Sequence, residues 1–110
     1  MSFASVARVV KAKEDALNAM IEATIWFDRC GDAMTGLDIS GAQREALLKK
    51  YDAIAPLVMA HIDLVARAER EASEVAWGLV HAVATAARKA AEGVIRSCDE
   101  VRLKVRTVDP

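Results

Sequence analysis

Apolar residues recur along residues 4–30 with the spacing of one face of an α-helix. The row consists of Val6, Val10, Leu17, Met20, Ile21, Ile25 and Phe27. Charged residues fall mostly on the other side, as they do in an amphipathic helix. Gly31 follows at a position where helices commonly end, because glycine adopts the left-handed conformation at low cost. The pattern therefore predicts a first helix over 4–30 and a loop over 31–40.

A second apolar row runs through residues 41–70. Ser40 and Gln43 have the spacing of a capping box, which predicts that a helix begins directly after Ser40. The row keeps its helical phase through Pro56, so we expect one helix that continues with a kink, at a cost of about 3 kcal/mol. The alternative is a break at which Pro56 opens a new helix, although Ala55 is a poor cap for it.

The segment from Leu57 to Cys98 contains no proline. As a single helix it would be about 63 Å long, whereas a compact domain of this size has a radius of gyration of about 13 Å. A chain reversal near Arg70–Ser73, with Ser73 as the cap of the next helix, removes this conflict and predicts a third helix over 73–98. The alternative is an extended hairpin that must dimerise to cover its apolar row.

The tail, residues 99–110, has a different pattern. Apolar and basic residues alternate there in the order Val101, Arg102, Leu103, Lys104, Val105 and Arg106. A period of two is typical of a β-strand, which could pair with a second copy or with another protein. The alternative is a frayed end or an extra helical turn. The sequence thus predicts a single all-α domain of three long helices in an antiparallel, dimer-forming bundle, with or without an extended tail.

The composition agrees with a helical domain and argues against a general nucleic-acid binder and a membrane-spanning protein. The chain has 110 residues, of which alanine, the best helix former, accounts for 22 and glycine plus proline for 7. The net charge of −1 argues against a general nucleic-acid binder. The longest run without a charged residue, 75–87, is shorter than the roughly 20 residues that span a bilayer.

The start of the chain and the cysteines predict a cytoplasmic protein. Arg8 and Lys11 interrupt the apolar start, so no secretory signal is expected. Cys30 and Cys98 then correspond to free thiols in a reducing compartment.

The sequence shows no catalytic, cofactor-binding or metal-binding motif. His61 and His81 are twenty residues apart, and neither belongs to a metal-ligand spacing such as H-x-x-x-H. Gly31 and Gly36 are not followed by the Lys and Ser or Thr of a phosphate-binding loop. We therefore expect no catalytic residue, no cofactor and no metal.

Two stretches, 53–62 and 75–87, are apolar around most of the helix. Such helices are buried on more than one side, yet each helix of a three-helix bundle has only two neighbours. The surplus predicts an interface with another chain. The candidate interface residues are Leu37, Ile39, Leu47, Leu48, Tyr51, Trp77, Val80, Val101, Leu103 and Val105.

The function expected from these features is that of a small non-enzymatic regulator. It would bind another protein through apolar helix surface, as an inhibitor or anti-activator that blocks the partner's assembly surface, and would form a homodimer. The first alternative is a ligand-binding or catalytic bundle that uses His61, His81 and Tyr51 in a core pocket. The second is nucleic-acid contact through the basic tail.

Overall fold

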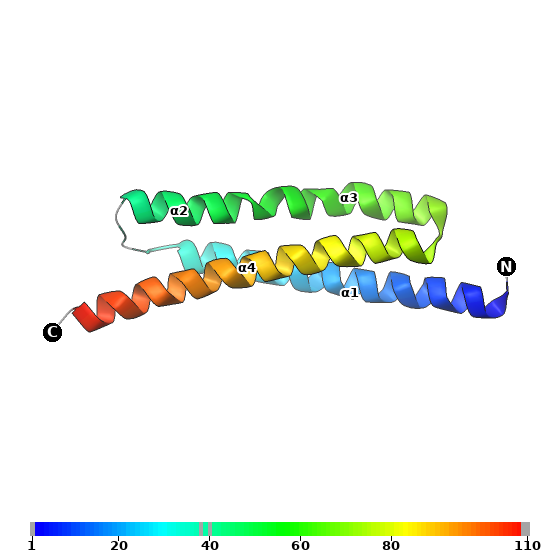
Figure 1. Cartoon of the computed structure of the whole chain (residues 1–110), viewed down its shortest axis with the longest axis horizontal. Helices are drawn as coiled ribbons and strands as arrows, with labels where there is room; N and C mark the ends of the chain where they lie inside the picture. Colours follow the sequence, from blue (N-terminus) through cyan, green and yellow to red (C-terminus); the bar gives the residue numbers. More distant parts are fainter. Residues whose placement is uncertain (1, 38, 40, 109–110) are drawn as a thin grey trace.

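The chain is all-helical over the residues that its computed structural model describes, which are 2–37, 39 and 41–108, with side chains through Leu103. The helices are α1 (Phe3–Met34), α2 (Gly41–Asp52), α3 (Ile54–Glu71) and α4 (Glu74–Val108). α2 and α3 lie end to end as one arm that runs against α1 and α4 (Figure 1). The result is a rod of 67 × 21 × 15 Å, in which α1 and α4 run in the same direction.

α1 extends beyond its predicted end at residue 30. The prediction that Gly31 ends the helix is wrong, because the helix continues through Gly31 to Met34. The Thr35 hydroxyl donates to the Gly31 carbonyl at 2.9 Å, and the left-handed conformation falls on Gly36, at φ 77°. Gly31 lies beside Tyr51, and a Cβ added there would make an ordinary contact with Tyr51 Oη at 3.4 Å.

The arm formed by α2 and α3 is interrupted at Ala53 and not at Pro56. The prediction of one helix over 41–70 with its kink at Pro56 is therefore not confirmed. Proline has no N–H, and its ring clashes with the carbonyl four residues earlier, here that of Asp52. α2 ends at that residue, and Pro56 lies in the first turn of α3, where helical N–H groups have no intrahelical acceptor.

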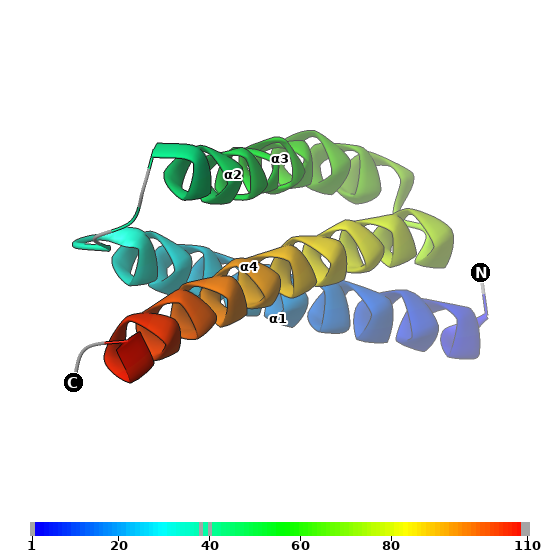
Figure 2. The ribbon, with the colours of Figure 1, turned by 60° about the vertical axis from the view of Figure 1, so that its left-hand side comes forward.

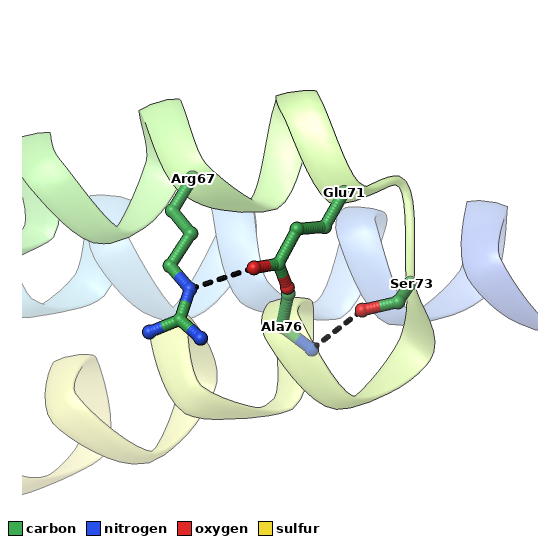
Figure 3. Close-up of polar contacts among 4 residues, drawn as sticks. All are labelled: Arg67, Glu71, Ser73 and Ala76. Carbon is green, nitrogen blue, oxygen red and sulfur yellow. Dashed lines mark hydrogen bonds and ion pairs between the residues drawn. The ribbon is translucent and has the colours of Figure 1, made fainter.

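The chain reverses between α3 and α4, within the segment that Ser73 indicated. Ala72 adopts the left-handed conformation, at φ 48°, and its N–H donates to the Ala68 carbonyl at 2.8 Å. Ser73 Oγ then accepts the Ala76 N–H at 3.1 Å, which caps α4 (Figure 3). On the α3 side of the turn, Arg67 Nε donates to Glu71 at 2.8 Å (Figure 3).

Of the two alternatives for the tail, the strand is wrong and extra helical turns are present, because α4 continues from the expected end at Cys98 to Val108. The Arg102 guanidinium donates to the Ala33 carbonyl, one of the C-terminal carbonyls of α1 that have no partner within their own helix. Val101 packs against the core at the same level. Neighbouring side chains of a helix are about 100° apart and can both face the bundle, whereas those of a strand point to opposite faces, so these two contacts favour the helix.

The core consists of two clusters that follow one another along α4. One cluster joins Ala23 and Cys30 of α1 to Ala84, Ala91 and Cys98 of α4, with Ile54 and Leu47 from the arm. A second, smaller cluster near the chain reversal contains Ala16, Ala68, Ala76, Trp77 and Val80. Small side chains on both helices let α1 and α4 pack closely along their length, whereas α1 touches α3 at few points.

Candidate interaction surface

Four of the ten predicted interface residues belong to the core. Trp77 is only 1% exposed, and Val80, Leu37 and Leu47 are also buried. Trp77 fills the space left by small neighbours such as Ala16 and Ala68, and the Lys13 ammonium lies 5.5 Å from its ring centroid. These four side chains therefore offer no surface to a partner, and their placement at the interface is corrected.

The other predicted interface residues differ in exposure. Leu48 and Leu103 are exposed. Ile39, Tyr51 and Val101 are half-buried against the larger core cluster, and Tyr51 stacks on Phe27 with ring centroids 5.1 Å apart. The side chain of Val105 lies outside the part of the chain that the structure describes.

The structure does not bring His61, His81 and Tyr51 into one pocket. His61 is buried, and loss of hydration lowers the pKa of its imidazole, although a hydrogen bond with the Val83 backbone acts in the opposite direction. His81 is exposed, whereas Tyr51 packs on Phe27 of α1. The geometry thus gives no support to a shared ligand site for these three side chains.

A shallow polar groove between α1 and α4 surrounds His81. It has a volume of about 300 Å³ and is lined by Asp15, Asn18, Ala19, Glu22, His81, Thr85 and Arg88. Its charges are paired, since Arg88 contacts Glu22 at 2.7 Å and Lys11 contacts Asp15 at 3.1 Å. Across the described residues, no three His, Cys, Asp or Glu side chains gather as metal ligands.

The two thiols share the larger core cluster, Cys30 on α1 and Cys98 on α4. Burial, together with the neighbouring Cys98, raises the pKa of Cys30 to about 11. Burial likewise raises the pKa of Cys98. Because the thiolate is the reactive form, these cysteines are poor nucleophiles at neutral pH.

The most prominent surface feature is a row of large apolar side chains along the outside of α1. The α1 row is defined here as Phe3, Val6, Val10, Leu17, Ile21 and Ile25, all of which are exposed. Ile21, for example, keeps 59% of its surface in contact with solvent. Beside these residues is an apolar hollow of about 470 Å³, lined by Leu17, Met20, Ile21, Thr24 and Ile25.

Five of these six residues belong to the apolar row recognised in the sequence, and an amphipathic helix normally turns such a face towards the core. The structure instead turns a row of small residues inward, and Ala16, Ala23 and Cys30 on that face are buried. These three positions are seven residues apart and were visible in the sequence as a second helical face. Since the small face packs closely against α4, the larger side chains remain outside.

α3 also has an exposed apolar side chain on the side that contacts α1. An ion pair at 2.9 Å between Lys13 and Glu69 joins the two helices on that side. Ile62 lies seven residues, or two turns, before Glu69, so it is on the same side of α3, and it is exposed.

Comparison with known proteins adds no assignment. No family model matches the chain, no curated protein matches its sequence, and no solved structure matches its fold. Within the described residues, none of the helices combines the length and the apolar character needed to cross a bilayer.

Proposed function

We propose that this chain is a small non-enzymatic regulatory protein that binds another protein through the α1 row. The observation that carries the proposal is the exposure of six large apolar side chains on one face of one helix, beside a hollow of about 470 Å³. Contiguous apolar surface of this kind marks interaction sites in soluble proteins, because it costs free energy when left in water.

The proposed mode of action is inhibition by occupation of the partner's assembly surface. A helix that lays its apolar face in a groove is a common mode of protein recognition. α1 is already folded against α4, so binding does not have to offset the entropy of ordering a flexible segment. A rigid helix of 32 residues can thus occupy a groove that otherwise receives a helix of the partner's own assembly.

Affinity capture from the native host's lysate tests this proposal. The bait proteins are the wild-type chain, Ile21→Glu, which places a charge in the α1 row, and the control Leu79→Glu. Leu79 is also apolar and is 45% exposed, but it lies on α4. We expect the wild type and Leu79→Glu to recover one protein at near one-to-one stoichiometry, and Ile21→Glu to lose it.

Circular dichroism of each bait checks that helix content is unchanged. Equal recovery by all three baits would place the binding surface elsewhere. Recovery of no other protein by the wild type would contradict the proposed function.

A further inference from the structure

We propose that a second copy of this chain covers the α1 row in the absence of the regulated partner, with the two α1 helices side by side and antiparallel. The regulatory meaning of this dimer rests on the proposed function, because both use the same face. The dimer itself follows from three properties of α1, namely its exposed area, its charge distribution and the direction of its neighbours.

The exposed area is sufficient for a specific dimer. The side chains of the α1 row expose roughly 600 Å² per copy, so complete coverage in a symmetric pair would bury about 1,200 Å² before flanking polar atoms are counted. That value reaches the lower end of the range for stable protein interfaces and exceeds most crystal contacts. In a twofold pair both α1 rows are removed from water, because each row covers the other.

The charges along α1 favour an antiparallel neighbour. Three basic and two acidic residues lie in its first half, and one basic and three acidic residues lie in its second half. The first turn has no acidic residue and the last turn no basic residue. The side chains therefore add to the helix dipole, which is positive at the N-terminus and negative at the C-terminus.

α4, the helix that packs most closely on α1, does not compensate this polarity. Lys13 lies over Trp77, Glu22 contacts Arg88, and Ala33 accepts from Arg102, so residue numbers rise together along α1 and α4. The two helices are thus parallel, and their dipoles point the same way. The α2–α3 arm runs in the opposite direction (Figure 2), and its contacts with α1 leave the side chains of the α1 row exposed.

The required partner helix would carry an apolar row, a basic first half and an acidic second half. α1 itself meets this description, so the sequence of the chain contains its own complement. With the twofold axis between residues 15 and 16, Val6 is level with Ile25 of the second copy and Val10 with its Ile21. Glu14, which interrupts the row, is then level with Leu17 of the second copy and one residue from its Asn18, whose amide can donate to a carboxylate.

Sedimentation equilibrium of the full chain tests the association. Concentrations of about 1 to 100 µM cover dissociation constants in the micromolar range. We expect the wild type and Leu79→Glu to have twice the chain mass of 11.9 kDa. Ile21→Glu should weaken the dimer at least about 100-fold, because it buries an unpaired carboxylate twice per pair. A monomeric wild type at the highest concentration, or a dimer that Ile21→Glu leaves intact, would overturn the proposal.

Cross-linking tests the direction of the helices. Val6 and Ile25 have matching exposures of 45% and 44%, so Val6→Cys and Ile25→Cys are matched single variants. With a short bismaleimide, the antiparallel dimer should link an equimolar mixture of the two, while Val6→Cys alone stays unlinked. A link of Val6→Cys to itself would indicate a parallel pair and contradict the proposal. The buried native cysteines, with their raised pKa values, provide the unreactive background.

The failure of this inference is distinguishable from the failure of the proposed function. A wild-type dimer that captures no other protein supports the second copy as occupant and contradicts the regulator. A monomeric wild type that captures a partner at the α1 row supports the regulator and contradicts the dimer.

Discussion

Trp77 is the largest of the fully buried side chains, and its position has a direct consequence for stability. It packs against Ala16, Ala68 and Ala76, which are too small to fill its volume after truncation. Trp77→Ala should therefore lower the free energy of unfolding by about 3–5 kcal/mol. Urea denaturation followed by circular dichroism measures this loss. A change below about 1 kcal/mol would show that Trp77 is not a core residue.

His61 makes stability depend on pH. Its ordinary pKa is 6.5, and burial lowers the pKa in the folded chain. The unfolded chain thus binds a proton first as pH falls, so stability is fully present above about pH 6.5 and decreases below it. Urea denaturation at pH 7 and pH 5.5 should show this decrease in the wild type and a smaller one in His61→Gln.

At the scale of single elements, the chain reversal was predicted from the length of the segment 57–98, and Ser73 indicated where the next helix begins. Ser73 has the side chain that a helix start requires, and its hydroxyl makes the expected bond in the structure. The interruption between α2 and α3 was less predictable, because Pro56 acts on the carbonyl four residues earlier and not at its own position. In the tail, the alternation of residues 101–106 was misleading, since the contact that orients Arg102 lies on α1, far away in sequence.

The α3–α4 turn also contains a strained backbone position, Ala72, at which a glycine would remove the strain. Ala72 adopts a left-handed conformation that costs a residue with a Cβ about 1 kcal/mol or more, and glycine avoids this cost. Ala72→Gly should therefore raise the free energy of unfolding by up to about 1 kcal/mol. The matched control is Ala66→Gly, at an exposed position inside α3, which should lower it by about 1 kcal/mol. Denaturant midpoints of the two variants should move in opposite directions; a shared direction would contradict the assigned turn.

At the scale of the whole molecule, the sequence pattern predicts an all-helical chain but does not show which face of α1 is exposed. Both kinds of apolar row on α1 have helical spacing, so periodicity alone does not decide which one faces inward. The structure decides through partner size, because the alanines of α4, such as Ala84, Ala87 and Ala91, accept only a small-residue face at close approach. To predict which face of α1 is buried, one must know which helix packs against it, and the periodicity of α1 alone does not give this information.

The two ends of the rod project beyond the α2–α3 arm, α1 at one end and α4 at the other (Figures 1 and 2). Lys13 of α1 is level with Trp77, three residues after the start of α4, so the first turns of α1 have little of their own chain beside them. Phe3, at 90% exposure, makes almost no contact within the fold. This end therefore contributes to the fold much less than it contributes to the proposed dimer.

Removal of residues 1–7 should separate these two contributions. In the Ile21→Glu background, where the chain is expected to be monomeric, the truncation should change the free energy of unfolding by less than about 1 kcal/mol, because none of the described residues 2–7 is buried. In the wild-type background it removes Phe3 and Val6 from each row, so the dissociation constant of the dimer should rise at least about tenfold. Denaturation and sedimentation equilibrium of the same two proteins measure both quantities. A truncated chain that keeps the wild-type dissociation constant would exclude the first turns of α1 from the interface, and with them the antiparallel register.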